Sequence, residues 1–362
     1  MNQKLVMLSL VALMVASCVQ EPVKITLTNP TETERTDEAV IITREQLAEM
    51  VSAIPDGEVP LLYRSEGDAY PCQADDIDQD GNWDELFFLV DMQAEETKSF
   101  VLEFVAPADV PVFERRTNIR FGDKNPPHEE LDQVERLKSN VTEISSKHFQ
   151  MEGPAWENDI VGFRNYFDAR NGIDIFGKRI AEMALDSVGL HDSYHELALW
   201  GMDILKVGNS LGAGAIGMLY KDSVYRLGLT EQAFYKRLFE GPLRSMFRMT
   251  YTGWEVDDNM YDVTHDISIW GGQYFYKSSV SISGMQGDEK LVTGIVNMES
   301  DTFYVYQPGD FTTLLTHANQ GFDGEVLGMA LLASSEDFVA TRTAPEEGEG
   351  VVQTYMMVLD AQ

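Results

Sequence analysis

Short runs of apolar, aromatic and β-branched residues follow one another along most of the chain, and turn residues separate them at short intervals. Residues 162–167, 280–283 and 303–306 are examples from the second half. This pattern is typical of antiparallel sheets, because strands that alternate with helices would be separated by longer helical segments. It predicts a mainly β fold, a large antiparallel β-sandwich with few short helices.

The first third of the chain carries runs of the same kind. They predict strands at 40–42, 58–63, 86–90 and 100–105. Two segments favour helices instead. One is 128–138, and the other is 230–239, where Thr230 is placed to cap the helix N-terminus.

The pattern divides the chain into five parts. We expect a signal peptide at 1–17, a lipidated cysteine with a tether at 18–38, an N-terminal β layer or small β domain at 39–110, a polar connection at 111–150, and a main β-sandwich domain at 151–362. The last part carries the candidate site.

The N-terminus has the features of an export signal. Lys4 precedes an apolar run over residues 5–16 that is too short to span a bilayer, and Val-Ala-Ser then leads into Cys18. A small residue before cysteine is typical of bacterial lipoproteins, although an ordinary cleaved signal peptide would have similar features. We expect an exported protein, held by a lipid on Cys18 at the periplasmic face or the cell surface, with no other membrane contact. Cys72 is then the only thiol left, and we expect it to be structural.

Charge narrows the classes of partner. The 362 residues include 60 Asp and Glu against 27 Lys and Arg, a net charge of −33. Binding to nucleic acid needs a basic surface, so no nucleic-acid partner is expected. An acidic surface fits an exported protein that stays soluble by self-repulsion.

An acidic stretch at 76–85 resembles the start of a calcium-binding loop. Asp76, Asp78, Asp80 and Asp84 alternate around Gly81, and carboxylates spaced in this way suit Ca²⁺. The match then fails, because Phe87 occupies the position where the loop needs Glu. The alternative is a charged hairpin turn. We expect a structural Ca²⁺ at most, and no cofactor required for activity.

Chemistry-bearing side chains gather between residues 152 and 208. Residues 160–179 carry four Lys or Arg and two Asp, a local reversal of the negative charge of the chain, and such a reversal suits an anionic ligand. The candidate substrate-binding residues are Arg164, Arg170, Lys206, Trp156, Glu157, Asn158, Tyr194 and Trp200. Aromatic faces stack on sugar rings, and Arg or Lys pairs with carboxylate or sulfate. Alternatively, the cations only neutralise Asp168, Asp174 and Asp203.

His195 and Tyr166 are the candidates for proton transfer. An elimination on a uronic acid needs a base that removes the C5 proton and an acid that protonates the leaving oxygen. Histidine suits the base near neutral pH, and a protonated tyrosine suits the acid. His191 is the next histidine to consider. No zinc motif and no nucleotide motif is present.

The motifs at 153–158, 161–168, 173–178 and 194–208 resemble a family of exported lipoproteins of unknown-function type from polysaccharide-degrading marine and gut bacteria. The resemblance extends over nearly the whole mature chain. One branch of the family is similar to ulvan oligosaccharide dehydratases, which remove water from a non-reducing-end uronic acid. The resemblance implies an anionic oligosaccharide as the partner and a carbon–oxygen lyase as the activity. It assigns no catalytic residue, so the roles above come from residue types.

Three functions compete at this stage. The first is a dehydratase of the lyase class, acting across C4–C5 of a terminal uronic acid in an anionic oligosaccharide such as an ulvan fragment. The second is a non-catalytic glycan-binding surface lipoprotein with the same aromatic residues and cations. The third is a glycoside hydrolase, which needs two carboxylates across a pocket, such as Glu152, Glu157 or Asp168.

Overall fold

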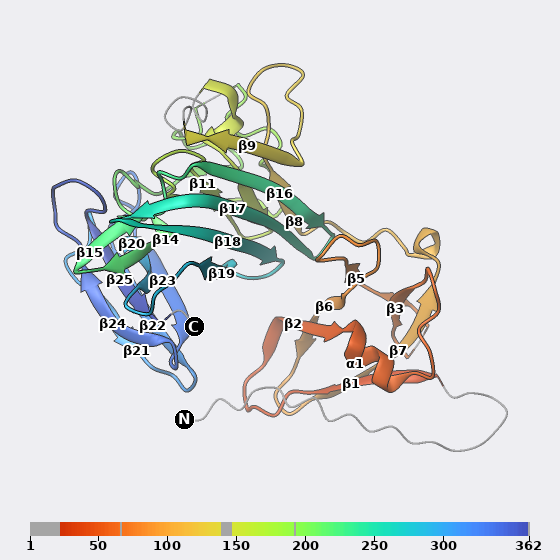
Figure 1. Ribbon diagram of the computed structural model, residues 1–362. Coiled ribbons are helices and arrows are strands. Elements are labelled where there is room, and N and C mark those ends of the chain that lie inside the picture. Colours follow the sequence, from red (N-terminus) through yellow and green to blue (C-terminus); the bar gives the residue numbers. More distant parts are fainter. Residues whose placement is uncertain (1–21, 66, 139–146, 192, 361–362) are drawn as a thin grey trace.

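A computed structural model describes residues 22–65, 67–138, 147–191 and 193–360. The strands of these residues pair into antiparallel sheets, and the same residues contain a single α-helix (Figure 1). The mainly β, sandwich-like fold expected from the sequence is confirmed. The signal peptide and Cys18 lie outside the described residues. Within those residues, no helix is both long and apolar enough to cross a bilayer.

The N-terminal module is a small two-sheet unit. One sheet has the strand order β1-β7-β3-β4 and the other β2-β6-β5. The strands are β1 (Val23–Thr28), β2 (Arg35–Thr43), β3 (Val59–Tyr63), β4 (Ala69–Tyr70), β5 (Cys72–Asp75), β6 (Glu85–Met92) and β7 (Thr97–Val105). The helix α1 (Arg44–Met50) follows β2, and a capping box from Thr43 and Gln46 begins it.

The core of this module lies between its two sheets. Leu62, Leu86, Phe88 and Phe100 are buried there. The module begins earlier than residue 39, because β1 pairs along its length with β7. The expected tether at 18–38 is therefore wrong for residues 23–38, most of which lie in β1 and β2. Alternate side chains of β1 face this core, and the polar residues between them hide that pattern in the sequence.

The second part of the chain contains four sheets. The first has the order β13-β12-β11-β10-β8, with β8 (Thr117–Arg120), β10 (Ala155–Asn158), β11 (Val161–Asn165), β12 (Ile173–Lys178) and β13 (Gly201–Asp203). The second has the order β19-β18-β17-β16-β9, with β9 (Gln133–Leu137), β16 (Gln232–Glu240), β17 (Arg244–Val256), β18 (Asn259–Trp270) and β19 (Lys277–Ser283).

The other two sheets contain most of the C-terminal strands. The third has the order β15-β14-β20-β25-β24, with β14 (Ala213–Tyr220), β15 (Ser223–Arg226), β20 (Lys290–Val296), β24 (Phe338–Thr343) and β25 (Thr354–Leu359). The fourth has the order β21-β22-β23, with β21 (Tyr304–Tyr306), β22 (Phe311–Ala318) and β23 (Leu327–Ser334). Within the described residues, 3₁₀ helices cover Pro107–Asp109 and Gln150–Glu152.

Both helices expected from the sequence, at 128–138 and 230–239, are wrong, and α1 was not expected. Residues 230–239 lie mostly in β16, and the second half of 128–138 is β9, which pairs with β16. In β9 every second side chain is buried, and Ala233 and Tyr235 are buried in β16. This period of two is that of a strand. The helix-favouring polar residues occupy the outward positions, where packing does not decide the conformation.

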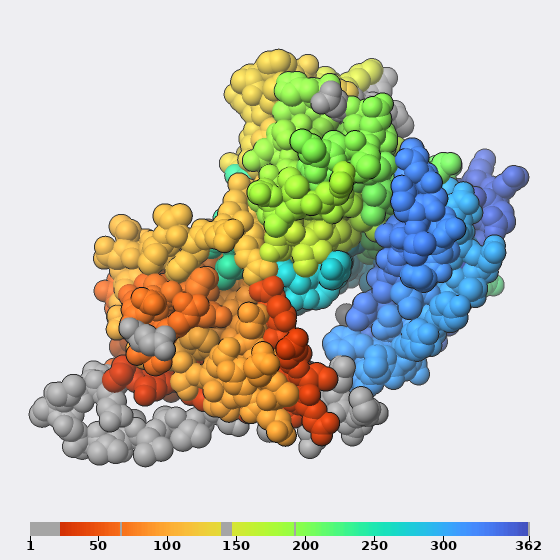
Figure 2. All heavy atoms as spheres, turned by 180° about the vertical axis from the view of Figure 1, so that it is seen from behind, coloured from red at the N-terminus to blue at the C-terminus, as the bar shows by residue number. Residues whose placement is uncertain are grey.

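The large core of the second part joins different sheets around Trp156. Its ring lies 5.8 Å from that of Phe163, 5.2 Å from Phe247 and 5.2 Å from Tyr276, measured between centroids. Trp156 and Phe163 come from the first sheet and Phe247 from the second. Figure 2 shows that the outer surface is hollowed between the N-terminal module and the C-terminal strands drawn in blue.

The two parts of the molecule meet at a buried ion pair. Arg244, at the start of β17, donates from Nε to Asp75 Oδ2 at 2.8 Å and from Nη2 to Glu85 at 2.7 Å. The Gln73 side-chain oxygen accepts from the backbone N–H groups of Leu243 and Arg244. Burial raises the pKa of Asp75 to about 6, although Arg244 opposes this shift. The module is thus fixed to the rest of the chain by specific polar contacts.

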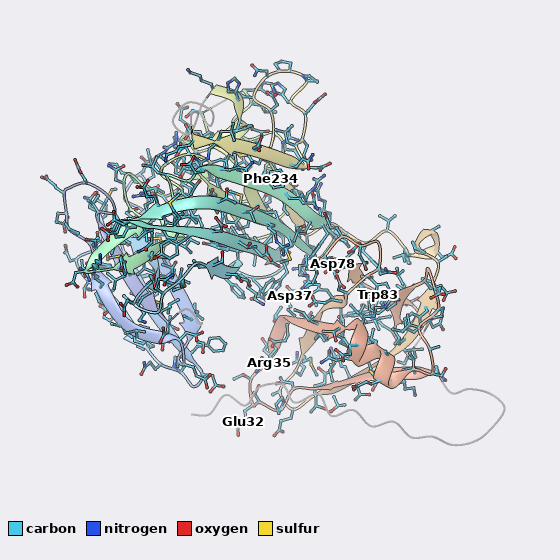
Figure 3. The ribbon with its side chains drawn as sticks, in the orientation of Figure 1. Glu32, Arg35, Asp37, Asp78, Trp83 and Phe234 are labelled. Carbon is cyan, nitrogen blue, oxygen red and sulfur yellow. The ribbon has the colours of Figure 1, made fainter. Side chains whose placement is uncertain are left out.

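A second contact lies beside the first. Arg116 donates to Asp37 of β2 and also pairs with Asp159, so one guanidinium links the N-terminal module to two segments of the second part. Figure 3 labels Asp37 on the side of the module that faces the long strands β17 and β18.

We predict that Arg244→Met weakens the attachment of the module. The substitution leaves the buried Asp75 without its cation, and loss of one partner of a buried pair costs about 3–5 kcal/mol. Denaturant unfolding should report this loss. Lys221→Met, which breaks the exposed pair with Asp257, is the control and should change stability little. Equal effects of the two variants would contradict the role of Arg244.

Candidate active site

A buried arginine organises the candidate site. Arg164 lies on β11, directly opposite Asp174 on β12, and its side chain is 0% exposed. Its guanidinium donates to Asp174 Oδ2 at 2.5 Å, to the Met151 carbonyl at 2.8 Å and to Tyr166 Oη at 2.9 Å. Because a charge cannot be buried unpaired at low cost, these acceptors are the condition for Arg164 to lie here.

A second buried carboxyl group lies beside this pair. Asp203 on β13 pairs in register with Phe176, so it is one step diagonal from Asp174 on the same face of the sheet. Its Oδ2 lies 3.4 Å from Arg164 Nη2. Burial raises the pKa of Asp203 to about 9, the neighbouring Asp174 adds to that shift, and Arg164 opposes it. Asp203 is therefore protonated near neutral pH, and Asp174 balances the charge of Arg164.

The backbone before β10 is bent toward this arginine. Met151 and Glu152 have φ of 54° and 64°, an unfavourable conformation for residues with side chains, and Gly153 has φ of 159°. A Cβ on Gly153 would lie 2.2 Å from the Asn165 carbonyl oxygen, so only glycine fits. The bend presents the Met151 carbonyl to Arg164 and the Glu152 carboxylate to Arg170.

Tyr166 lies between two guanidinium groups. The Arg164 Cζ is 3.9 Å from the centroid of its ring, and the Arg170 Cζ is 3.7 Å from it. The phenol donates to Asp174 Oδ2 at 3.1 Å. Burial raises the pKa of Tyr166 well above its usual range, and Arg164 only partly offsets that effect. Tyr166 therefore keeps its proton at neutral pH.

His195 is the titratable ring that this network presents to solvent. Its Nδ1 lies 3.4 Å from Asp203 Oδ2, and its side chain is 46% exposed. One face of the ring stacks on Phe322 at 5.5 Å, and Tyr194 packs beside it at 4.5 Å between centroids. With Nδ1 directed at Asp203, Nε2 is the nitrogen available to a ligand.

A small pocket adjoins Phe322, the ring that stacks on His195. It has a volume of about 190 Å³, and Lys206, Met298, Glu299, Asn319 and Gln320 line it together with Phe322. Phe322 thus belongs both to the pocket and to the stack on His195. The Phe322 backbone N–H donates to the Ile204 carbonyl at 2.8 Å, which ties the loop after β22 to the segment after β13. Lys206 is exposed, and none of the ion pairs among the described residues includes it.

The structure gathers part of the predicted set. Arg164, Tyr166, Tyr194 and His195 form one network, and Lys206 lies at the adjoining pocket. Arg170 is bound to Asp168 and Glu152 at its exposed end. The alternative reading, in which the cations only neutralise nearby aspartates, therefore holds for Arg164 and Arg170. It does not hold for Lys206, which makes no ion pair with Asp203.

Three predicted substrate-binding residues lie in the interior. Trp156, Glu157 and Asn158 are each 0% exposed. Glu157 accepts from Lys178 Nζ and from the backbone N–H groups of Ala184 and Leu185, so it anchors the loop that covers this face of the sheet. Their assignment as substrate-binding residues is wrong, because none reaches the surface.

The two remaining candidates, Trp200 and His191, lie near that covering loop. Trp200 is half-buried against Phe176 at 5.8 Å between centroids, which is a packing role. His191 is exposed and lies 6.4 Å from the ring of His128, away from the contacts of His195. Neither belongs to the network around Arg164.

Two members of the site were missed as functional residues. Asp203 was taken only as a counter-charge, and Phe322 was not considered. Asp203 follows His195 by a loop and a short strand, and Phe322 is far along the chain. A buried acidic residue between apolar neighbours, as in Met202-Asp203-Ile204, was the one available signal.

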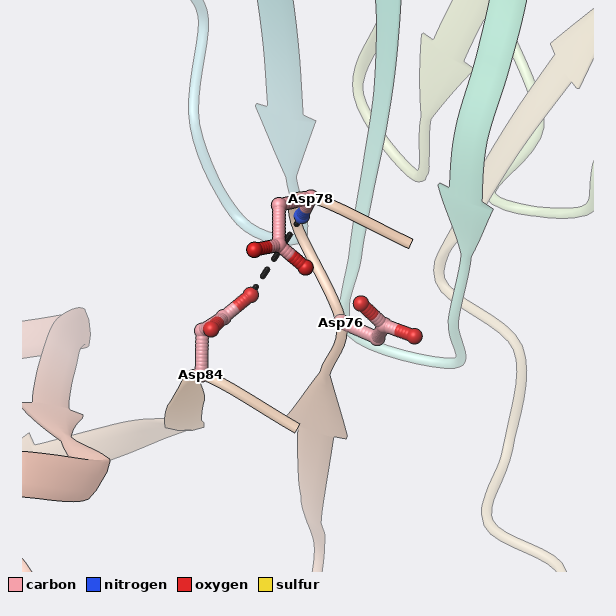
Figure 4. A group of neighbouring side chains, drawn as sticks. All are labelled: Asp76, Asp78 and Asp84. Carbon is pink, nitrogen blue, oxygen red and sulfur yellow. Dashed lines mark hydrogen bonds between the residues drawn. The ribbon is translucent and has the colours of Figure 1, made fainter. Parts of the chain in front are cut away.

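The acidic turn forms a group of converging carboxylates. Oxygens of Asp76, Asp78 and Asp84 lie within 4.8 Å of one another (Figure 4). Asp80 is not part of this group, and its carboxylate accepts from Asn82. Asp84 accepts from the backbone of Ile77, as a turn residue does. The arrangement fits both a cation site and a hydrogen-bonded turn, and the structural Ca²⁺ stays a prediction.

We predict that Asp203 makes stability depend on pH. Its folded pKa of about 9 lies above the unfolded value of about 3.9, so its contribution is fully present below about pH 4 and is lost as the pH rises through about 9. Asp203→Asn is neutral at every pH. The melting temperature of Asp203→Asn minus that of the wild type should increase as the pH rises from about 5 to 9. For the control Asp258→Asn, on an exposed turn, the same difference should not change with pH. A constant difference for Asp203→Asn would contradict the shift.

We predict that Ca²⁺ raises the melting temperature of the wild type and that a chelator reverses this effect. Asp76→Asn combined with Asp84→Asn should remove the response, because two of the three converging carboxylates lose their charge. Asp80→Asn is the control, since its carboxylate lies outside the group. A melting temperature that does not respond to Ca²⁺ would leave the turn as a hairpin connection only.

Comparisons with known proteins place the chain in a family. One curated relative, "Uncharacterized protein P7" of Formosa agariphila, is 25% identical over 198 residues, and the match covers 49% of this chain and 48% of the relative. The match thus spans about half of that relative.

Two solved structures from Enterococcus faecalis were also matched. An alpha-mannosidase is 9% identical, with a TM-score of 0.36, covering 92% of this chain and 42% of that chain. A glycosyl hydrolase family 38 protein is 10% identical, with a TM-score of 0.37, covering 92% and 44%. Similarities this weak carry no argument about function.

The model of a domain of unknown function, DUF4861, matches residues 27–361, and the chain therefore belongs to the DUF4861 family.

Proposed function

We propose that this protein is a carbohydrate-active dehydratase of the lyase class. It removes water across C4–C5 of the non-reducing-end uronic acid of an anionic oligosaccharide, such as an ulvan fragment. The observation that carries the proposal is His195: a half-exposed imidazole next to the buried Asp203, stacked on Phe322 of a pocket whose Lys206 is in no ion pair of the described residues. A base and an anion-binding group next to each other are what this elimination needs.

His195 is the base in this proposal. Its Nε2 takes the C5 proton, and the electron pair of the C5–H bond forms the C4–C5 double bond as the C4–O bond breaks. The leaving oxygen takes a proton and departs as water. Asp203 Oδ2 lies 3.4 Å from Nδ1, and a carboxyl oxygen that accepts the Nδ1–H leaves Nε2 as the basic nitrogen of the ring.

Lys206 is the group that neutralises the substrate carboxylate. The C5 proton becomes more acidic when a cation stabilises the enolate-like intermediate at the adjacent carboxylate. Arg164 and Arg170 were the first candidates for this task, but their guanidinium groups are already matched by carboxylates of the protein. The exposed Lys206 belongs to none of the ion pairs of the described part of the chain, although Glu299 lines the same pocket.

Tyr166 is the proton donor of the proposal. Its raised pKa keeps it protonated, and its bond to Asp174 connects it to a buried acidic pair that can return the proton. Tyr194 is the second candidate, because its hydroxyl accepts from Arg164 Nη1 at 3.4 Å, next to His195. The phenylalanine variants of the two tyrosines separate them.

A non-catalytic glycan-binding protein is the alternative. The exposed aromatic side chains of the described residues, among them Tyr274 at 81%, favour it as a surface that sugars could cover. Export and lipidation at Cys18 stay predictions under either function, because that residue lies outside the described range. Release of a Cys18→Ser variant from the membrane fraction would test them.

We predict that His195→Ala and Tyr166→Phe each lower turnover by about 10²–10⁴-fold, the usual contribution of a general base or acid. The ultraviolet absorbance of the unsaturated uronate measures turnover with uronate-ended oligosaccharides. His191→Ala is the matched control and should keep normal turnover. Near-normal turnover in both variants would remove the pair from the mechanism, and binding without any rise in absorbance would favour the glycan-binding alternative.

We predict that Lys206→Met lowers kcat/KM for uronate-ended oligosaccharides by about tenfold or more, since a charge-assisted contact is lost. Lys277→Met, on the exposed strand β19, is the control and should leave kcat/KM unchanged. If Lys206→Met retains full kcat/KM while Arg170→Met loses it, the anion is held by Arg170 instead.

A further inference from the structure

The sheet β21-β22-β23 has a face that is exposed and free of charge. Its three strands contain no Asp, Glu, Lys or Arg, in a chain where 24% of the residues are charged. One face packs on the main core through Leu314 and Met329. The register places Tyr304, Tyr306, Phe311, Leu315, His317 and Leu332 on the other face.

This outer face, which we call the tyrosine face, carries flat aromatic surface. Tyr304 is 49% exposed and Tyr306 53%, and their ring planes lie within 25° of each other at 6.5 Å between centroids. Phe311 at 46% and Leu332 at 64% extend the same surface. Large aromatic side chains left exposed side by side, without a charged residue among them, indicate a surface with a binding role.

The tyrosine face continues into the candidate site through the chain itself. Strand β22 ends at Ala318, and the loop that follows supplies Asn319, Gln320 and Phe322 to the pocket. His317 lies at the end of the face nearest this loop, and Phe311 lies at the far end. At about 3.3 Å per residue, the face extends for roughly 20 Å from the pocket end of β22.

We propose that the tyrosine face binds the sugar residues that follow the reacting uronic acid, so that long oligosaccharides are held along β22. This inference rests on the proposed function. Sugar rings offer C–H surface to aromatic faces and hydroxyl groups to hydrogen-bonding side chains, and Tyr304, Tyr306, Thr313 and His317 offer both kinds of contact. The absence of acidic residues here also spares an anionic glycan the repulsion of the surrounding surface.

Two other occupants fit less well. An anionic membrane would present a continuous layer of charged headgroups to a strongly acidic protein with no cation on this face, whereas sugar rings can stack on the tyrosines with their carboxylates directed away. A second copy of the chain would bring two such proteins together, each with a net charge of −33. The sugar chain is therefore the occupant that the composition of the face favours.

The test compares short and long ligands. Tyr304→Ala combined with Tyr306→Ala should weaken binding of a long ulvan oligosaccharide by about tenfold or more, as loss of aromatic anchors does, and should lower kcat/KM for it by the same factor. Binding and kcat/KM for a disaccharide that fills only the pocket should not change. Leu229→Ala, which removes an apolar side chain of similar exposure (58%) from the loop between β15 and β16, is the control.

Several results would overturn the inference. One is an unchanged affinity of the double variant for the long oligosaccharide, and another is an equal loss for both ligand lengths. Self-association of the wild type in sedimentation that the double variant abolishes would assign the face to a second copy. Hydrogen exchange of the wild type adds a measurement without substitution, because the long oligosaccharide must protect residues 304–317.

The binding assay is independent of turnover. If no elimination is detected but the double variant loses affinity only for the long ligand, the proposed function fails and the tyrosine face stands. If elimination proceeds with equal preference for short and long substrates in the wild type and in the double variant, the face fails and the proposed function stands.

Discussion

The charge of Arg164 is the constraint on which the candidate site depends. A guanidinium with no exposed surface must be matched by acceptors, and here two neighbouring strands, β12 and β13, and one bent loop supply them. The cross-strand position of Asp174, the diagonal position of Asp203 and the left-handed residues 151–152 all serve that requirement. Removal of any one would take an acceptor from a buried guanidinium whose Nε already has none.

The protonation states of the site follow from the single positive charge of Arg164. Two buried carboxyl groups share the neighbourhood of one cation, so one of them, Asp203, retains its proton. Asp203 then meets His195, which lies half in solvent, while Tyr166 is held on the other carboxyl group. The buried network thus holds His195 and Tyr166, and Lys206, which no ion pair among the described residues includes, lies at the adjoining pocket. The strands of the sheet fix the positions of the buried charged groups, and the loops around residues 195, 206 and 322 carry the side chains that a ligand can reach.

The sequence was sufficient for the fold class and for part of the site. Period-two runs predict strands wherever the inward residues are apolar, and they failed where polar residues hid the pattern, as in β1, β9 and β16. The density of Arg, Tyr and His near residue 164 located the network. The sequence did not show that Trp156 and Arg164 lie on opposite faces of their sheet. A shift of one residue along a strand moves a side chain from the face of the site to the face of the core. Contacts between segments far apart along the chain, such as that of Phe322 with His195, could not be predicted from the sequence.

Transfer of the C5 hydrogen is the step that tests the central claim most directly. Mass spectrometry can follow an oligosaccharide whose non-reducing-end uronic acid carries deuterium at C5, incubated with the wild type. The account predicts a product that has lost water together with the deuterium, since the C4–C5 double bond leaves no hydrogen at C5. A product that loses water but retains deuterium, or one that is cleaved at a glycosidic bond, would contradict elimination by His195 at this site.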